Sequence, residues 1–478
     1  MLGIEYVAGF LKSKGHKVDL IFDPGLAETP YGRLPFLATP RLTEKMLNKA
    51  RHFGPDIVMF SATTYSYPNV RQMALLIKNA LAVPTLVGGV HPTMAPEDVI
   101  RDEAFDMLCI GEGELAAAEL LDRMQRGLNY TQVRNIWVKE KGIIHRNEVR
   151  ELVDINTLPP PDKEIFAQYG CISGTLYVMA NRGCPFDCTY CFNSFYKKLY
   201  EGKGNYVRFR NPELVIAEIK DFIRQYPIRR VVFEDDTFTL NRNWLNRFLL
   251  LYGEQIAIPY RCLVRANTIT PEIARRLKKS GCVWAHMGLE SGDDSVANQL
   301  LGRKMLTKEV VEAAQLLKSE GIRIKLFAIF GFPDETADQM FTTVAAVEQI
   351  RPNAVCSYIF VPYPGTKLFD YSLQKNYIVG NPFETSAYNP PSIHEESILN
   401  HPQHELAYNI KVLLPFYNKS PALFRPAIRR LMTERRFNRF VADFLYMASV
   451  PCYSGGELWP KVRESASILV KTQVHYAK

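Results

Sequence analysis

Short apolar runs alternate with helix-like stretches along the first third of the chain. Residues 4–15 carry apolar side chains at helical spacing and end on Gly15. Four apolar runs of strand length follow at 17–23, 56–62, 84–89 and 106–111. Helical spacing returns in the segments 42–53, 68–81, 95–102 and 113–126. This alternation predicts a parallel sheet with helices on both faces, and because the chain opens on a helix we expect the sheet to lack its usual first strand.

The pattern changes after residue 126. The segment NIWVKEKGIIHRN predicts a β-hairpin that turns at Lys141 and Gly142. The proline-rich segment 158–164 predicts an extended connection. We therefore expect one domain over residues 1–150 and a linker over 151–170.

Six further strand–helix units follow the linker. The expected strands are 175–181, 229–235, 259–265, 283–289, 322–330 and 354–360. Asn211-Pro212 and Thr270-Pro271 predict helix starts, because each places an N-cap residue before a proline at the first helical position. Six units are two fewer than a closed eight-stranded barrel needs, so we expect a partial (β/α)6 barrel over 171–377, with its chemistry at the C-terminal strand ends. A mostly helical region is expected over 378–478.

Composition excludes several classes of protein. The chain has 478 residues, of which 47% are hydrophobic, and a net charge of +8, so it is not disordered. No run reaches the ~18 uninterrupted apolar residues of a membrane span, and the N-terminus lacks the pattern of a secretory signal. We therefore expect a cytoplasmic protein. A charge of +8 spread over three domains gives no indication of nucleic-acid binding.

Three of the nine cysteines fall within eight residues, at Cys184, Cys188 and Cys191. This Cys-x3-Cys-x2-Cys spacing follows the first expected strand of the barrel. Three thiolates on one loop can hold three irons of a [4Fe–4S] cluster and leave the fourth iron open to a small molecule. The alternatives are a zinc site, although no fourth Cys or His lies nearby, and three unrelated core cysteines.

The segment 181–193 resembles the signature of the radical S-adenosylmethionine (SAM) superfamily, and the resemblance spans about 171–377. It implies that Cys184, Cys188 and Cys191 hold a [4Fe–4S] cluster whose fourth iron chelates the amino and carboxylate groups of SAM. It also implies that the reduced cluster cleaves SAM to a 5′-deoxyadenosyl radical, which takes hydrogen from the substrate. A flavodoxin or ferredoxin would supply the electron.

The resemblance extends to residues at successive strand ends. Acid after the second strand would recognise the SAM amino group, with Asp236 as first choice and Asp235 as second; a helix N-cap is the alternative role. Glu290 would accept from the ribose hydroxyls, Gly331 would let the backbone approach adenine, and Tyr190 would either shield the cluster or simply pack. The complete set of expected SAM-binding residues is Tyr190, Glu234, Asp235, Asp236, Arg265, Asn267, Glu290, Ser291 and Gly331.

Three loops of the first domain place small and polar residues at the edge where doubly wound sheets bind ligands. Followed by such a barrel, the order GGxHxT…GEGE resembles the cobalamin (B12)-binding class of the superfamily, over about 1–150. The motif Asp-x-His-x-x-Gly of many B12 enzymes is absent, as is often the case in this class. The absent first strand removes a loop that normally helps to form the site. The expected cobalamin-lining residues are Ser61, Thr63, Thr64, Tyr65, Gly88, Gly89, His91, Thr93, Gly111, Glu112, Gly113 and Glu114.

These resemblances imply a cobalamin-dependent radical SAM methyltransferase acting on an unactivated carbon, or less often phosphorus, of a small or lipid-like substrate. An oxidative cyclase or rearrangement enzyme of the anaerobic porphyrin-ring cyclase type shares the cofactors and stays open. A non-catalytic iron–sulfur protein with a vestigial corrinoid domain is a further alternative. A tRNA methylthiotransferase is rejected, because Cys109 is the single cysteine in the first domain and the tail is helical.

Arginines interleave with aromatic residues in the segment 424–446. Basic amphipathic helices lie on anionic membrane surfaces, so this segment could bring the barrel mouth to a lipid-like substrate. The alternative is a solvated helix that covers the open side of the barrel.

Overall fold

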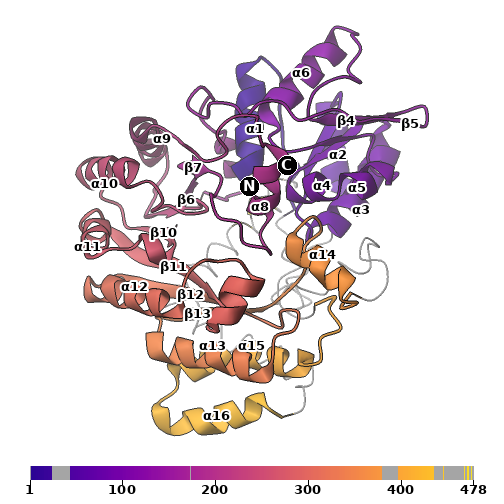
Figure 1. Cartoon of the computed structure of the whole chain (residues 1–478). Helices are drawn as coiled ribbons and strands as arrows, with labels where there is room; N and C mark the ends of the chain where they lie inside the picture. Colours follow the sequence, from indigo (N-terminus) through magenta and orange to yellow (C-terminus); the bar gives the residue numbers. More distant parts are fainter. Residues whose placement is uncertain are drawn as a thin grey trace.

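A computed structural model describes residues 2–23, 44–172, 174–378 and 397–434, together with Leu445, Ile468, Lys471, Thr472 and His475. Figure 1 shows an N-terminal α/β domain beside a larger curved layer of strands, whose outer side is covered by helices. The chain therefore has the expected class of fold, a Rossmann-like domain followed by a partial barrel and C-terminal helices.

The N-terminal domain is built on a five-stranded sheet of order β1-β2-β3-β4-β5. Its first three strands are parallel, and β4 and β5 join antiparallel at one edge. The strands are β1 (Val58–Ser61), β2 (Thr85–Gly88), β3 (Met107–Cys109), β4 (Ile136–Glu140) and β5 (Ile143–His145). The helices are α1 (Leu2–Ser13), α2 (Glu44–Phe53), α3 (Tyr67–Leu81), α4 (Val90–Met94), α5 (Pro96–Arg101) and α6 (Glu114–Gln125). The hairpin turns at Lys141 and Gly142 as predicted, and both residues have the positive φ that a tight hairpin turn requires.

Residues 17–23 do not form a strand, which corrects the expectation from their apolar run. Val18, Leu20 and Phe22 pack with α1 and with α7 (Glu164–Ala167), whereas Ile21 packs with α2 and α3 on the other side of the sheet. The segment thus alternates between the two helix layers as a strand does. Within the described ranges it forms no backbone ladder with β1, which pairs there with β2 alone, and both residues 17–21 and β1 line one cavity. Among the described residues, this segment therefore has no neighbouring strand to pair with.

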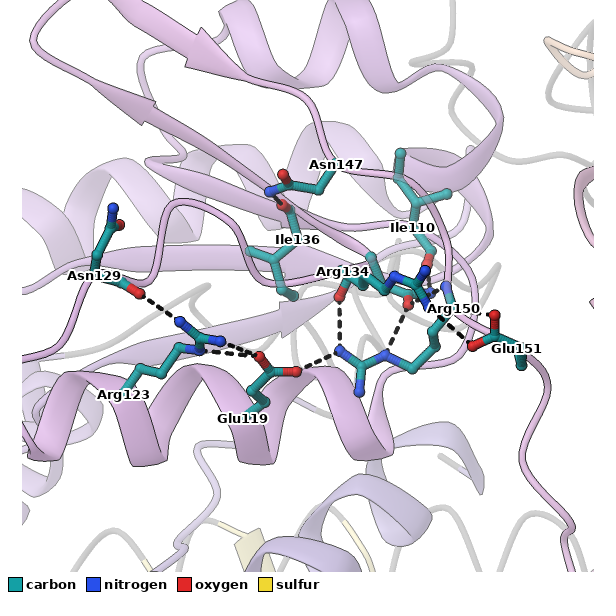
Figure 2. Close-up of polar contacts among 10 residues, drawn as sticks. Ile110, Glu119, Arg123, Asn129, Arg134, Ile136, Asn147, Arg150 and Glu151 are labelled. Carbon is teal, nitrogen blue, oxygen red and sulfur yellow. Dashed lines mark hydrogen bonds and ion pairs between the residues drawn. The ribbon is translucent and has the colours of Figure 1, made fainter.

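A polar network supports the loop that follows β3 (Figure 2). Asn135 is fully buried with φ 72°, and its side-chain amide donates to the Ile110 carbonyl at 2.7 Å. Arg150 donates to the side-chain oxygen of Asn135 at 3.0 Å and pairs with Glu119 of α6 at 3.0 Å. Because Ile110 directly precedes Gly111, the network fixes the start of the 111–114 loop from behind.

The second sheet is entirely parallel and has the order β13-β12-β11-β10-β9-β6. Its two edge strands, β6 and β13, do not pair with each other, so the barrel is partial, as predicted. The strands are β6 (Thr175–Val178), β9 (Arg230–Phe233), β10 (Tyr260–Val264), β11 (Cys282–Glu290), β12 (Arg323–Phe330) and β13 (Ala354–Ile359). A two-stranded antiparallel ribbon, β7 (Asn181–Arg182) and β8 (Arg208–Phe209), stands at the mouth beside β6.

Helices cover one face of the second sheet and build the largest hydrophobic cluster of the described chain. The two predicted caps are confirmed: Asn211 accepts from the Glu213 N–H at 3.1 Å, and Thr270 accepts from the Ile273 N–H at 3.3 Å. The covering helices are α9 (Pro212–Gln225), α10 (Arg242–Gln255), α11 (Pro271–Lys279), α12 (Thr307–Ser319) and α13 (Ala337–Ile350). Two further helices pack in other hydrophobic clusters, α8 (Phe192–Leu199) with the first domain and α14 (Lys367–Gln374) beside η4. Short helical turns are η3 (Ala266–Thr268) and the π-turn η4 (Val296–Leu300).

The C-terminal region adds two helices to the helical side of the barrel, α15 (His404–Lys419) and α16 (Arg425–Met432), joined by η5 (Ala422–Phe424). Arg425 pairs with Glu348 of α13 at 2.7 Å, and the Arg429 guanidinium lies 4.7 Å from the Phe341 ring centre. The described part of 424–446 therefore packs on α13 and does not cover the open side of the barrel. Residues 435–444 and 446 lie outside the described residues. Within the described chain, no helix combines the length and the apolar character of a membrane span.

Candidate functional site

A cavity of about 640 Å³ connects the C-terminal edge of the first sheet to the mouth of the barrel. On the first domain it is lined by Ser61, Gly88, Gly89, Gly111, Glu112, Gly113 and Glu114. On the barrel side it is lined by Asn181, Arg182, Gly183, Asn193, Glu234 and Asp236. Residues from two separate sets of strand ends therefore share one cavity, which is the position where open α/β sheets and partial barrels both bind ligands.

The cysteine loop is flanked by residues that line this cavity, Gly183 before it and Phe192 and Asn193 after it. It runs from Cys184 to Cys191, which is the N-cap of α8. Thr189, inside the loop, is tied to η4 by its N–H to the Leu301 carbonyl at 3.0 Å. Burial raises the pKa of the Cys191 thiol to about 12, so cluster binding would have to release its proton.

Asn193 joins the cysteine loop to the acid after β9. Its amide nitrogen lies 3.8 Å from Cys191 Sγ and donates to Asp236 at 2.9 Å. The Tyr206 hydroxyl donates to the Asn193 side-chain oxygen at 2.6 Å, which fixes the orientation of the amide. Asp236 faces the cavity but is surrounded by protein, and this burial raises the pKa of its carboxyl group.

Asp235 points away from the cavity, in contrast to its neighbour. It is 1% exposed, and its carboxylate accepts the backbone N–H of Ala180 at 2.7 Å and that of Asn181. Burial raises its pKa to about 7 despite these donors. Asp235 thus connects the chain after β6 to the chain after β9. Of the three acids that follow β9, Asp236 and Glu234 are the two that a ligand in the cavity can reach.

Glu290 and Tyr190 meet at an arginine that the sequence analysis missed. Arg303 donates to the Tyr190 hydroxyl at 2.8 Å, to Glu290 at 3.0 Å and to the Gly288 carbonyl at 2.7 Å. Glu290 has φ 61°, and its carboxylate folds back over Gly288, where a Cβ would collide with it. Burial raises the pKa of Glu290, and Arg303 opposes that rise.

The other residues expected near SAM divide into supporting and exposed positions. Arg265 stacks on Phe186 of the cysteine loop at 3.7 Å and donates to the Arg303 carbonyl. Ser291 is 1% exposed and accepts the Asp293 N–H at 3.2 Å, so its hydroxyl supports the chain after β11. Asn267 is exposed in η3 and is not among the residues that line the cavity.

Gly331 adopts φ 78°, which is the conformation that a close approach of the backbone requires. Its N–H, however, donates to Glu335, a residue that was not predicted to belong to the site. Glu335 accepts the N–H of Gly331 at 2.7 Å and that of Phe332 at 3.1 Å. Burial raises the pKa of Glu335 to about 8, against the effect of the two donors. This carboxylate holds the 330–335 turn in shape.

Glycines and one threonine shape the loops of the first domain. A Cβ at Gly89 would lie 2.7 Å from the Ala62 carbonyl, and one at Gly111 would collide with the Tyr200 hydroxyl. Thr93 donates to the Gly89 carbonyl at 2.8 Å and accepts the Gly111 N–H at 2.9 Å. The two glycine loops are therefore tied together, with little room for a side chain at either position.

Four further residues expected around cobalamin do not line the cavity. His91 and Thr64 are each 4% exposed, and His91 Nδ1 lies 3.2 Å from the Thr64 hydroxyl. Burial lowers the pKa of His91 to about 4, so its ring is neutral at pH 7. Thr63 exchanges hydrogen bonds with Ser66 in the turn before α3. Neither these three residues nor Tyr65 are among the cavity-lining residues.

Several residues at the site carried no sequence signal. Arg303 and Glu335 lie outside the motifs, and their partners become visible only after folding. Asn193 lies two residues after Cys191, so its position beside that cysteine could have been inferred from its spacing.

The residues present fit the three groups that the motifs imply. Among the described residues, no three His, Cys, Asp or Glu side chains are close enough to share a single metal ion. A [4Fe–4S] cluster needs no such set, because each cysteine binds a different iron. Asp236 and Glu234 offer carboxylates to an ammonium group, and the loops that carry Gly88, Gly89, Gly111 and Gly113 offer backbone to a second ligand in the same cavity.

Comparisons with known proteins agree with this division of the chain. A family model of the B12 binding domain matches residues 1–121, and a model of the radical SAM superfamily matches residues 178–347. The chain is 29% identical over 388 residues to an uncharacterized methyltransferase, PH0819, of Pyrococcus horikoshii, with 79% of each chain covered. It is 24% identical over 387 residues to the anaerobic magnesium-protoporphyrin IX monomethyl ester cyclase of Rubrivivax gelatinosus, covering 77% of this chain and 65% of the relative.

Among solved structures, the fold is similar to that of the radical SAM methyltransferase TsrM from Kitasatospora setae. The TM-score is 0.66 and the sequence identity 13%, with 97% of this chain and 96% of the other covered. At this identity the similarity establishes a common fold.

Proposed function

Since the chain is a radical SAM protein with a B12-binding domain, we propose that it is a cobalamin-dependent methyltransferase acting on an unactivated carbon or phosphorus. The observation that carries the proposal is the single cavity that joins the glycine loops of the first domain to Asp236 and Asn193 beside the cysteine loop. A corrinoid and SAM bound at these two ends would face each other across one protein-enclosed space. The similarity to PH0819 of Pyrococcus horikoshii, which is named a methyltransferase, supports the same activity.

Each bound group supplies chemistry that amino acids lack: the cluster provides the electron that cleaves SAM, and the corrinoid carries the methyl group. Cys184, Cys188 and Cys191 would hold the cluster, and Asn193 would orient Cys191 through its amide. Asp236 would accept from the SAM ammonium, and its hydrogen bond from Asn193 couples that carboxylate to the cysteine loop. A reduced flavodoxin or ferredoxin would donate the electron.

Glu290 would bind the ribose hydroxyls, with its carboxylate oriented by Arg303. Tyr190, which shares that arginine, would close the site between cluster and nucleoside. Around the corrinoid, Gly88, Gly89 and Gly111 would allow backbone to approach the ring, and Thr93 would keep the two loops in register.

The test is anaerobic purification with cobalamin supplied, followed by iron and cobalt analysis and by assay with SAM. We expect about four irons and one cobalt per chain, and formation of both S-adenosylhomocysteine and 5′-deoxyadenosine under reducing conditions. A protein that contains iron but no cobalt would contradict the proposed methyltransferase activity, and a radical SAM reaction without cobalamin would then be the remaining explanation. Failure to form 5′-deoxyadenosine in the fully loaded protein would indicate a non-catalytic iron–sulfur protein.

An oxidative cyclase or rearrangement enzyme is the second candidate, and the similarity to the Rubrivivax cyclase favours it specifically. The two activities differ in the fate of SAM. A cyclase forms 5′-deoxyadenosine without a matching amount of S-adenosylhomocysteine, whereas the methyltransferase consumes SAM in both ways and adds the mass of one methyl group to its product.

For the surface around α16 we propose peripheral contact with anionic lipid. In η5, Leu423 is 83% exposed and Phe424 is 58% exposed, and Arg430 lies on the adjoining helix α16. Co-sedimentation with phosphatidylglycerol vesicles at low salt should be lost in the variant Leu423→Ser/Phe424→Ser. Equal sedimentation of the variant and the wild type, or none with either, would remove the proposal.

A further inference from the structure

Arg182 connects the two domains at the wall of the cavity. It lies on β7, two residues before Cys184. Its guanidinium lies 3.2 Å from Glu112, in the loop that follows β3 of the first domain, and 2.6 Å from Glu114, the first residue of α6. The same guanidinium stacks on the ring of Tyr6 in α1 at 4.6 Å. One barrel side chain therefore holds two elements of the B12-binding domain.

A second arginine strengthens this contact from the neighbouring strand. Arg208 on β8 is the register partner of Arg182 in the two-stranded ribbon, and it binds Glu112 at 2.5 and 3.1 Å. Burial works against ionisation of Glu112, but Arg208 and Arg182 outweigh it, and the pKa of this carboxyl group is lowered. The N–H of Glu112 is also held, by the Tyr200 hydroxyl at 2.8 Å.

The contact is buried and its charges balance. The side chain of Arg182 is 14% exposed and that of Glu114 is 5% exposed. Nearby, Lys163 of the linker pairs with Glu5 of α1 at 2.8 Å, and within the barrel Arg210 pairs with Glu218 of α9 at 2.6 Å. Buried ion pairs contribute little net stability but strongly favour one arrangement over others, because any displacement leaves a charge without its partner.

The ion pairs of Arg182 and Arg208 with Glu112 and Glu114 are called the clasp below. The loop 111–114 that they hold is also expected to line the corrinoid. Glu112, Glu114 and Arg182 all line the cavity, and Gly183 and Cys184 directly follow Arg182. The carboxylates of Glu112 and Glu114 are thus engaged with the barrel, and the loop can offer a corrinoid its backbone and glycines instead. The clasp therefore sets the distance between loop 111–114 and the cysteine loop.

We propose that Arg182 is a positioning residue, which fixes the corrinoid relative to SAM by clasping Glu112 and Glu114. This inference rests on the proposed function. Methyl transfer from SAM to the corrinoid requires the two to be aligned, whereas reductive cleavage of SAM at the cluster does not involve the corrinoid. A misplacement of 1 Å can lower a rate about 100-fold. Loosening the clasp should therefore slow methyl transfer from SAM to the corrinoid and leave the reductive cleavage of SAM unchanged.

The test uses the full-length protein loaded with both cofactors. The main variant is Arg182→Met/Glu114→Gln, which removes one charge of each sign and so avoids a buried unpaired carboxylate. Arg182→Lys is the charge-conserving variant, which keeps the positive charge but loses the planar fork of donors that binds carboxylates bidentately. Arg134→Met is the matched control, because Arg134 pairs with Glu151 on the exposed surface of the same domain.

Two rates are measured for every protein under chemical reduction: single-turnover formation of S-adenosylhomocysteine per bound cobalt, and formation of 5′-deoxyadenosine. In the double variant we expect iron and cobalt contents equal to wild type, an unchanged 5′-deoxyadenosine rate and a loss of about 100-fold in S-adenosylhomocysteine formation. Arg182→Lys should show a smaller loss, and the control none.

Other outcomes overturn the inference in distinguishable ways. Equal effects on both rates, or no effect on either, would show that the clasp is merely structural. Loss of cobalt from the double variant alone would make Arg182 a residue needed for binding and not for positioning. Absence of cobalt from the wild-type protein would instead contradict the proposed function itself.

Discussion

The buried carboxylate of Glu335 accepts the backbone N–H of Gly331 at 2.7 Å and so occupies the donor of the glycine that the sequence placed near adenine. The other carboxylate oxygen of Glu335 is buried and has no hydrogen-bond partner among the described residues. A carboxyl group in this position is more stable protonated than charged, in agreement with its raised pKa of about 8. Glu335 is therefore a structural support whose charge state depends on pH.

This pKa predicts a pH-dependent stability. The folded protein keeps a proton on Glu335 that the unfolded chain loses near pH 4.3, so the free energy of unfolding should fall as pH rises towards about 8 and level off above it. Glu335→Gln keeps the two acceptor bonds without a charge. We expect the variant to be more stable than wild type at pH 9, by about 1.4 kcal/mol for each unit of the pKa shift. Urea unfolding at pH 5, 7 and 9 tests this, and parallel curves for the two proteins would contradict it.

Arg303 should be essential for the stability of the nucleoside end of the site. Arg303→Met leaves the carboxylate of Glu290 buried without its partner, which costs about 3–5 kcal/mol. The double variant Arg303→Met/Glu290→Gln removes that charge and should recover most of the loss. Lys308→Met, in the exposed pair with Glu312, is the control and should change stability by less than ~0.5 kcal/mol. Urea unfolding separates these cases; a double variant no more stable than Arg303→Met would be inconsistent with the explanation.

Gly111→Ala should impair cobalamin binding. The added Cβ would collide with the Tyr200 hydroxyl and displace the loop over the cavity. We expect cobalamin affinity to fall about tenfold or more, which corresponds to at least ~1.4 kcal/mol. Gly127→Ala controls for backbone strain, because Gly127 also has positive φ but open space around its Cα. Spectrophotometric titration with hydroxocobalamin measures both, and equal losses in the two variants would attribute the effect to strain alone.

Cys188→Ala should abolish the cluster without removing the corrinoid. Cys188 lies on the barrel loop, whereas the glycine loops belong to the other domain. We therefore expect iron to fall to near background and 5′-deoxyadenosine formation to cease, with cobalt binding kept. Cys356→Ala, on β13, should retain full iron content. Metal analysis after anaerobic reconstitution is the measurement, and full iron in Cys188→Ala would exclude this cysteine as a ligand.

The hydrophobic pattern was sufficient to predict most of the fold. All six barrel strands, the hairpin turn and the caps at Asn211 and Thr270 occur where the pattern placed them. These features depend on residues close together in sequence, because side-chain alternation, helix periodicity and capping are local properties. The run 17–23 is the exception, since a strand also needs a neighbouring strand, and among the described residues β1 is paired on one edge only.

The site was predicted less completely, because the sequence does not show which way a side chain points or which distant residue it meets. Adjacent residues of an extended chain point to opposite sides, so sequence could name Asp235 and Asp236 together but not decide which one reaches the cavity. His91 and Thr64 belong to the right loops yet face the interior. Arg303 and Glu335 hold predicted residues in place without belonging to any motif.

The sequence by itself determined the order of the domains, the partial barrel and the three cysteines on one loop, because each depends on local patterns or on fixed spacing. Tertiary structure decided how the domains meet: Arg182 and Glu114 are separated by 68 positions and lie 2.6 Å apart only after both sheets have formed. Ion pairs and hydrogen bonds of this kind depend on distance in space, and no local pattern of residues encodes that distance. The geometry between the two cofactor ends of the cavity is therefore a property of the folded chain.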